Sequence, residues 1–236
     1  MRLCLIHTSD HHGRLTVSQA RRLRQLKQDR QALLLDSGDA LGSPNLFSYP
    51  WDEAVVSAMN EAGYDALCMG NREFGLLSAA MRGKLGRMRF PVLAANVQVQ
   101  RGRYPQLQRW TILDTNGLRV GVFGLSQPLL RGRSLWERAA AVRHTDALTA
   151  AREAIHALQP ETDLLVALTH YGEKPEHDLA AACPELSAIL AGHWHMQQPS
   201  LELAGHTAIS RTFAHARGAA ILTFDGTNWT QEVEQL

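Results

Sequence analysis

The chain has 236 residues, of which 45% are hydrophobic and 20% charged, and this length and composition suit one α/β domain spanning residues 1–236. Its 24 Lys and Arg residues nearly balance its 23 Asp and Glu residues, and the net charge of +1 gives no global electrostatic case for binding nucleic acid or an anionic membrane. Any affinity for an anion must therefore come from a local site.

The three cysteines, Cys4, Cys68 and Cys183, lie far apart and form no pair at the spacing of zinc-ribbon or redox motifs. Two of them fall within apolar runs, which indicates buried free thiols. The start of the chain leads directly into a predicted strand without the apolar region of a signal peptide, and no apolar run reaches membrane-spanning length. We therefore expect a cytoplasmic protein with no membrane partner.

Short apolar runs that end in polar residues recur along the chain. The runs are residues 3–6, 32–35, 66–70, 164–168 and 188–192, and they lead to Asp10 and His12, to Asp39, to Asn71, to His170, and to His193 and His195. A short apolar run bounded by a glycine turn indicates a strand that is covered on both faces. Open α/β sheets place their chemistry where such strands end. We expect five strands to deliver oxygen and nitrogen ligands to one edge.

Helical periodicity predicts helices between these strands. Residues 17–30 combine an apolar stripe with a basic face, which indicates a solvated surface because no aromatic platform for nucleic acid accompanies it. A second helix over residues 54–62 should be opened by Pro50 and ended by Gly63. The remaining expectations in this half are a helix at residues 76–85 and a strand at residues 90–95 that ends at Asn96.

Antiparallel structure is predicted in the second half of the chain. Asn116-Gly117 separates apolar residues 110–113 from residues 119–125, and this dipeptide favours a hairpin turn. Residues 126–144 should form an irregular, arginine-rich loop, either the rim of an anion site or an ordinary solvated segment. Further expected elements are a helix capped by Thr145 and closed by Pro160, a short helix near residues 176–182, and strands at 201–204, 207–210, 219–224 and 229–233.

Seven polar residues at the strand ends form a set that suits metal binding. They are two carboxylates, one amide and four imidazoles: Asp10, His12, Asp39, Asn71, His170, His193 and His195. Taken singly, each could cap a turn or make a structural hydrogen bond. Together they supply what two neighbouring divalent ions need, with one carboxylate bridging. Two such ions against two carboxylates and a hydroxide leave a local charge of about +1, which suits a phosphate.

The motifs around these residues resemble those of a known family. They are HTSDHHG at residues 7–13, DSGD at 36–39, the segment 63–74 with GNREF, FPVLAAN at 90–96 and GHWH at 192–195. In this order they resemble the calcineurin-like metallophosphoesterases, and most closely the catalytic domain of 5′-nucleotidase-type enzymes. The resemblance covers nearly the whole chain, and it implies an α/β fold that is a four-layer α/β/β/α sandwich with mixed sheets.

The resemblance also implies two divalent metal ions. Asp10, His12, Asp39 and His195 would hold the first ion, and Asp39, Asn71, His170 and His193 the second, so that Asp39 bridges them. The reaction of the family is in-line attack on phosphorus by a metal-bridging hydroxide. Manganese is the expected ion, with iron, zinc, cobalt and nickel as alternatives, because imidazole and carboxylate suit all of them.

Two positions depart from the nucleotidase pattern. Arg72 stands where the nucleotidases have a histidine, and Gly75 stands where they have the aspartate that orients this histidine. A guanidinium stays protonated, so it cannot act as the leaving-group acid, although it can hold phosphate oxygens bidentately. With an arginine at this position, the motif is similar to that of the UDP-diacylglucosamine pyrophosphatases of lipid A synthesis. The rest of the sequence resembles those enzymes less. We expect no nucleobase-binding domain of the nucleotidase kind, so no nucleoside specificity is carried over.

We expect a dinuclear metal phosphohydrolase that cleaves a phosphodiester, pyrophosphate or nucleotide-like phosphoester in a small substrate, with Arg72, Asn71 and His170 as its catalytic residues. A 5′-nucleotidase-type phosphomonoesterase is one alternative, and a non-catalytic interaction module that keeps the fold is another. The complete set of ligands disfavours the module. Three further histidines could supply a proton to the leaving group, although a structural role is the expectation for each: His11, His144 and His215.

Overall fold

Two mixed sheets lie face to face in the computed structural model, which describes residues 2–45, 53–128, 135–171 and 175–236. The seven-stranded sheet has the order β15 (Trp229–Gln235), β14 (Gly218–Phe224), β1 (Leu3–Thr8), β2 (Leu33–Asp36), β3 (Ala66–Cys68), β4 (Val92–Leu93) and β6 (Leu107–Gln108). The six-stranded sheet has the order β12 (Ser200–Ala204), β13 (Thr207–Phe213), β11 (Ala188–Met196), β10 (Leu164–His170), β8 (Leu118–Ser126) and β7 (Trp110–Thr115). β5 (Val97–Val99) and β9 (Val142–His144) pair separately.

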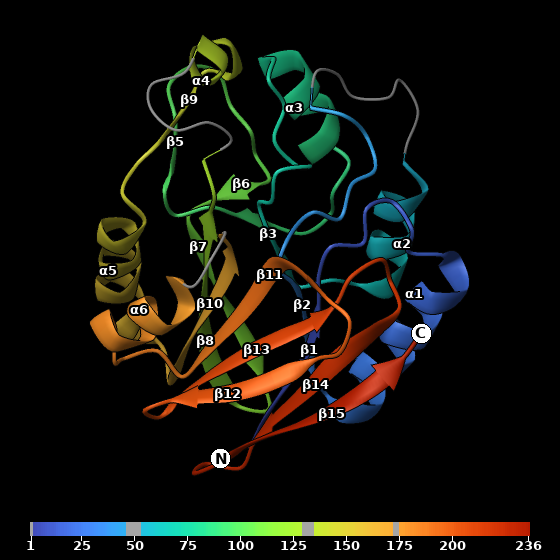
Figure 1. Cartoon of the computed structure of the whole chain (residues 1–236), viewed down its shortest axis with the longest axis vertical. Coiled ribbons are helices and arrows are strands. Elements are labelled where there is room, and N and C mark those ends of the chain that lie inside the picture. Colours follow the sequence, from blue (N-terminus) through green and yellow to red (C-terminus); the bar gives the residue numbers. More distant parts are fainter. Residues whose placement is uncertain (1, 46–52, 129–134, 172–174) are drawn as a thin grey trace.

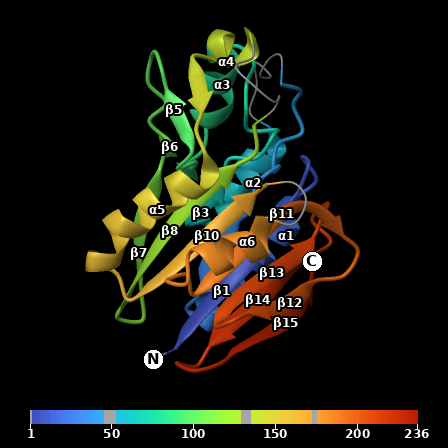
Figure 2. The same cartoon turned by 60° about the vertical axis from the view of Figure 1, so that its left-hand side comes forward.

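Helices cover the outer face of each large sheet (Figure 1). α1 (Val17–Arg30) and α2 (Ala54–Ala62) lie against the seven-stranded sheet, and α5 (Ala147–Leu158) and α6 (Pro175–Ala182) lie against the six-stranded sheet. α3 (Ser78–Leu85) and α4 (Leu135–Ala140) lie with β5 and β9 at one end of the molecule, as the turned view also shows (Figure 2). The layers are therefore helix, sheet, sheet and helix, which is the sandwich expected from the resemblance.

Alternate residues of the central strands point into different apolar clusters. In β1, Cys4 and Ile6 pack with residues of α1 and α2, whereas Leu3 and Leu5 pack between the two sheets. The strands of the six-stranded sheet alternate in the same way between the inter-sheet cluster and a third cluster under α5 and α6. Because these strands are apolar on both faces, they appear in the sequence as continuous apolar runs, as predicted.

The arrangement of the second half differs from the expectation. β8, β10, β11 and β13 are parallel neighbours, whereas β7 with β8, β12 with β13 and β14 with β15 are antiparallel, so the second half is mixed rather than antiparallel throughout. The helix α5 lies in the crossover from β8 to β10 and α6 in the crossover from β10 to β11, whereas strand β12 lies between β11 and β13 in the chain. The predicted hairpin is present between β7 and β8, with positive φ at Asn116 (50°) and Gly117 (76°). β14 and β15 return to the seven-stranded sheet beside β1.

Several element boundaries also differ from those predicted. α2 begins at Ala54, and Pro50 lies outside the described residues, whereas Gly63 ends this helix with φ of 74° as predicted. The cap of α5 is Asp146 rather than Thr145, because the Asp146 carboxylate accepts a backbone N–H of the first turn at 2.8 Å. The loop predicted to be irregular contains α4 and β9, and two of its arginines, Arg131 and Arg133, lie outside the described residues.

The surface and the thiols agree with the sequence-based expectations. All three cysteines are free and buried. Within the described ranges, no helix has both the length and the apolar character needed to cross a membrane. Basic residues of α1 form ion pairs with acidic residues of neighbouring elements: Lys27 with Asp65 at 2.7 Å, Arg22 with Glu234 at 2.8 Å and Arg30 with Glu232 at 2.9 Å. The basic face is therefore partly neutralised within the chain.

Candidate metal centre

Polar side chains from both large sheets meet where their strands end. β1, β2 and β3 run parallel in one sheet, and β10 and β11 run parallel in the other. The residues brought to this edge are Asp10 and His12 after β1, Asp39 after β2, Asn71 after β3, His170 at the end of β10, and His193 and His195 within β11. The centre therefore lies across two sheets, whereas the apolar runs by themselves suggested the edge of one.

Two groups of three side chains place metal-binding atoms close together. Asp10, His12 and His195 form the first group, and in it the Nε2 atoms of the two histidines lie 3.0 Å apart, with Asp10 Oδ1 3.2 Å from His195 Nε2. Asp39, His170 and His193 form the second group. There, His170 Nε2 lies 3.2 Å from His193 Nδ1 and 3.4 Å from Asp39 Oδ1. Lone-pair donors converge in both groups.

Two buried oxygen atoms at this edge indicate which kind of ligand the two groups could bind. Within the described part of the chain, Asp10 Oδ1 and Asn71 Oδ1 are buried and have no hydrogen-bond partner. An unsatisfied buried polar atom costs roughly 1–3 kcal/mol, so it calls for an explanation such as an ion. Divalent cations bind carboxylate, amide and imidazole donors of this kind. The residues present therefore fit two divalent ions.

The ring of His170 is oriented by a backbone carbonyl. His170 Nδ1 lies 2.8 Å from the Ser37 carbonyl oxygen, which can only accept, so Nδ1 carries the proton and Nε2 faces the second group. The Ser37 hydroxyl donates to the Leu190 carbonyl at 2.8 Å, which joins the two sheets directly beneath the site. Such an outer partner fixes the tautomer of a metal-binding histidine.

Asp10 connects the two groups. Its Oδ2 accepts the Ser9 hydroxyl at 2.5 Å and the backbone N–H of His193 at 2.9 Å, which leaves Oδ1 facing His12 and His195. Because His193 belongs to the second group, the hydrogen bond from its N–H to Asp10 fixes the position of one group relative to the other. The orientation of the Asp10 carboxylate is therefore set before any ion binds.

Backbone strain is concentrated at the same place. Five of the ten described non-glycine residues with positive φ belong to the two groups: Asp10 (52°), His12 (49°), Asp39 (58°), His193 (73°) and His195 (47°). Each such residue costs of the order of 1 kcal/mol and persists only where the surrounding structure holds it, as at functional sites. Gly70 is needed for a different reason, since a Cβ atom there would lie 2.4 Å from the Asp39 nitrogen.

In the metal-free protein, histidine side chains supply the positive charge that faces the buried carboxylates. Burial lowers the pKa of His170, but the hydrogen bond and charge of Asp39 outweigh it and raise this pKa from 6.5 to about 9. Burial raises the pKa of Asp39, but His170 outweighs it and lowers this pKa. The pKa of Asp10 is also lowered, because the facing imidazoles of His12 and His195 favour the carboxylate form and outweigh the effect of burial. The metal-free second group therefore holds an imidazolium facing a carboxylate.

A pH dependence of stability follows for the metal-free protein. The pKa of His170 is raised from 6.5 to about 9 in the folded protein. Its contribution to the free energy of unfolding is therefore complete below pH 6.5 and is lost as the pH rises through 9. The melting temperature of EDTA-treated protein should therefore fall over this interval, by roughly 2–4 °C for each kcal/mol lost. Calorimetry from pH 6 to 9.5 measures this fall in melting temperature. In metal-loaded protein an ion takes the place of the proton on His170, so the melting temperature should not depend on pH in this way. Equal slopes with and without metal would contradict this prediction.

The other three histidines have different surroundings. His11 is buried, and its Nε2 lies 3.0 Å from the Tyr64 hydroxyl and 3.3 Å from Asp36, so it has the structural role that was expected. The ring of His144 packs against Phe74 with centroids 5.8 Å apart. The ring of His215 lies beside the first group, with centroids 5.2 Å from that of His12 and 5.3 Å from that of His195. Of the three, the structure brings His215 next to the candidate ligands.

Sequence reasoning missed three buried ionisable residues around the site. Asp36 accepts the Thr8 hydroxyl at 2.6 Å and the Gly38 N–H at 2.8 Å, and so shapes the turn before Asp39. The others are Glu73 and Lys84, which lie behind the loop that carries Asn71. The DSGD and GNREF segments contained Asp36 and Glu73, but nothing in the local sequence distinguished Lys84 from an exposed helix residue.

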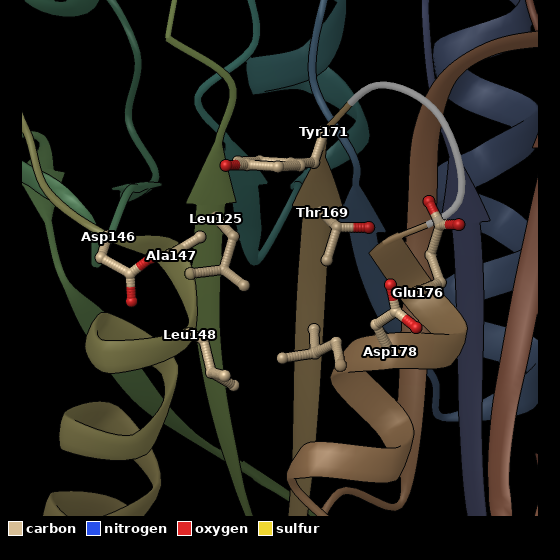
Figure 3. A pocket seen from close by; sticks show the side chains of 9 residues that line it. Leu125, Asp146, Ala147, Leu148, Thr169, Tyr171, Glu176 and Asp178 are labelled. Atoms are coloured by element: carbon tan, nitrogen blue, oxygen red, sulfur yellow. The ribbon is translucent and has the colours of Figure 1, made fainter. Parts of the chain in front are cut away.

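A hollow of about 200 Å³ lies behind β10, between α5 and α6 (Figure 3). Leu125, Leu148, Thr169 and Tyr171 are among the residues that line it. Side chains alternate along a strand, so Thr169 and Tyr171 lie on the face of β10 opposite to His170. The hollow is therefore on the helix-covered face of the sheet and is not part of the metal groups.

Comparison with known proteins agrees with this geometry. The sequence profile described as calcineurin-like phosphoesterase matches residues 5–197. The chain belongs to this family. It has two candidate metal-binding groups at the residues that the motifs indicated.

The relatives include enzymes that act on nucleotides. A trifunctional nucleotide phosphoesterase of Bacillus subtilis is 26% identical, and the match covers 94% of this chain and 18% of the relative. A 5′-nucleotidase of Vibrio cholerae is 27% identical, and the match covers 90% of this chain and 43% of the relative. The chain thus spans less than half the length of these curated relatives. The structure of a Thermus thermophilus 5′-nucleotidase precursor matches with a TM-score of 0.80 at 20% identity. The match covers 100% of this chain and 55% of the nucleotidase chain.

Proposed function

We propose that this phosphoesterase is a dinuclear, metal-dependent enzyme that cleaves phosphodiester, pyrophosphate or nucleotide-like phosphoester bonds in small substrates. The observation that carries the proposal is the pair of three-residue groups, with one ligand atom of each residue within 4.8 Å of the others in its group. Asp10, His12, Asp39 and His195 would hold the first ion, and Asp39, Asn71, His170 and His193 the second, with Asp39 shared.

The chain positions these groups, and the ions supply the chemistry. Bound divalent ions would activate water and neutralise charge on phosphoryl oxygens. Asp39 Oδ1 accepts the backbone N–H of Arg72 at 2.8 Å, which keeps the shared carboxylate next to the loop that carries Asn71. Two ions facing two buried carboxylates would leave a local positive charge, and this supports an anionic substrate for a chain of nearly neutral net charge.

Arg72 is proposed as a clamp for phosphate oxygens. Its backbone lies against Asp39, its side chain is half-buried, and no carboxylate among the described residues is within ion-pair distance of its guanidinium. A guanidinium in this position is suited to hold two phosphate oxygens at once. Asn71 and His170 would act as ligands beside it.

Arg72→Ala should raise KM, lower kcat, or both. The lost interaction is a charged hydrogen bond worth roughly 1.5–3 kcal/mol, which corresponds to about a 10- to 150-fold loss in kcat/KM. Metal content should be unchanged, because the side chain is not a proposed ligand. Arg24→Ala on α1, where the arginine side chain is 53% exposed, is the matched control. Wild-type kinetics for Arg72→Ala at saturating metal would show that the guanidinium points away from the substrate.

The names of the relatives support a nucleotide-like substrate, and a 5′-nucleotidase-type monoesterase is the second candidate. Arg72 and Gly75 disfavour it, since neither can serve as a leaving-group acid. A panel of diesters, monoesters and pyrophosphates assayed with Mn²⁺, together with metal analysis, tests the proposal. Metal binding without turnover of any compound would favour the interaction module instead. Manganese as the ion and a cytoplasmic location stay predictions.

A further inference from the structure

Two buried residues of opposite charge lie behind the loops that follow β2 and β3. Glu73 is 0% exposed and Lys84 is 3% exposed. The loop after β2 carries Asp39, and the loop after β3 carries Asn71 and Arg72. The function proposed above does not use either buried charge. Burying an ion costs free energy unless it is paired or hydrogen-bonded, so their contacts are informative.

Glu73 gathers backbone N–H groups from both loops. Its Oε2 accepts the N–H of Asp39 and of Gly70, each at 2.9 Å, and its Oε1 accepts the N–H of Ala40 at 2.9 Å and of Leu41 at 3.1 Å. One carboxylate thus satisfies four donors. It holds the residue before Asn71 against the residue proposed to bridge the ions.

Lys84 gathers carbonyl groups from the same two loops. Its ammonium donates to the carbonyl oxygens of Arg72 at 2.7 Å, Phe74 at 3.3 Å and Ser43 at 3.5 Å. An ammonium has three protons, so this set uses all of them. Among the described residues, no carboxylate lies within 4.0 Å of it, and its closest contacts are therefore main-chain dipoles.

A methionine or leucine would fill the Lys84 position without the cost of a buried charge, but it would leave the carbonyl oxygens of Ser43, Arg72 and Phe74 without this donor. Burial does lower the pKa of Lys84, to about 8, and the charge of Glu73 partly offsets this effect. A charge retained at such a cost points to a role other than packing.

We propose that Lys84 is a positioning residue that acts through Arg72. The Arg72 carbonyl is held by Lys84 at 2.7 Å, and the Arg72 N–H is held by Asp39 Oδ1 at 2.8 Å. With the peptide groups on both sides fixed, the direction in which the Arg72 side chain leaves the backbone is set before substrate binds. This inference rests on the proposed function of Arg72 as a phosphate clamp.

A double-mutant cycle with Lys84→Met and Arg72→Ala tests the inference. Lys84→Met alone should lower kcat/KM roughly tenfold, because a misdirected clamp loses most of its charged hydrogen bond. In the Arg72→Ala background the same substitution should change kcat/KM less than about twofold, since the clamp is already absent. Losses that multiply in the double variant would overturn the inference and indicate a general structural role.

Controls separate this result from misfolding and from failure of the proposed function. Arg82→Met removes an exposed cation from the same helix, α3, and should leave kcat/KM unchanged. Metal content should stay at the wild-type value in every variant. If Lys84→Met does not fold, Lys84→Gln enters the same cycle under the same criterion. An Arg72→Ala variant with wild-type kinetics would refute the clamp itself, whereas a strong Arg72→Ala effect with multiplying losses would refute only the role of Lys84.

Discussion

Asp39→Asn should remove most of the activity and lower the metal content of both groups. Asp39 lies in the second group and is the carboxylate proposed to be shared with the first. Its replacement keeps the shape of the side chain but removes the negative charge that both ions would use. We expect kcat/KM to fall by well over the roughly 10–100-fold that loss of an outer-shell partner costs.

His12→Ala is the matched comparison for Asp39→Asn. His12 belongs only to the first group, so its loss should affect chiefly one ion. Metal analysis per chain and kcat/KM, measured side by side, should therefore show the larger fall in both quantities for Asp39→Asn. Equal metal loss in the two variants would contradict a shared carboxylate. An active, metal-free wild-type protein would refute the dinuclear mechanism altogether.

Aryl phosphodiesters and pyrophosphate-linked substrates should react far faster than alkyl phosphomonoesters such as AMP. An alkoxide leaving group develops charge that a general acid normally neutralises, and Arg72 cannot donate a proton. A nitrophenolate or a nucleotide phosphate carries that charge more readily. The expected margin in kcat/KM is comparable to the roughly 10²–10⁴-fold that general acid catalysis supplies.

Comparison of kcat/KM for AMP and for bis-nitrophenyl phosphate checks this prediction. The sequence suggests restoring the missing pair as Arg72→His with Gly75→Asp, but the structure rules out a simple exchange. A Cβ atom at Gly75 would lie 2.4 Å from the Met81 nitrogen and 2.8 Å from its Cα, so α3 would have to shift. Arg72→His alone is therefore the usable variant, and it should narrow the gap only in part.

A wild-type enzyme that hydrolyses AMP as fast as the diester would contradict the prediction. It would indicate a proton donor other than the residue after Asn71. His215 would then be the first residue to replace, because its ring lies beside those of His12 and His195. His11 is the matched control, since its ring is buried against Tyr64 and Asp36.

Most of the elements and all of the candidate ligands could be predicted from the sequence, for local reasons. A strand with apolar clusters on both faces must be an apolar run, and a residue at its end must be polar if it is to bind an ion, so Asp39 and His170 were recognisable. The helix end at Gly63 and the turn at Asn116-Gly117 depend on positive φ, which few residue types adopt easily. These features are properties of short segments.

Only the tertiary structure decided which segments meet. It distributed the strand ends over two sheets, placed His215 but not His11 beside the ligands, and left no space for a side chain at Gly75. It also gave Lys84 its role, because the carbonyls that bind its ammonium come from Ser43, Arg72 and Phe74. The physical reason is the same in each case: hydrogen bonding and steric exclusion depend on atoms that are distant in the sequence, and no local pattern records which of them pack together.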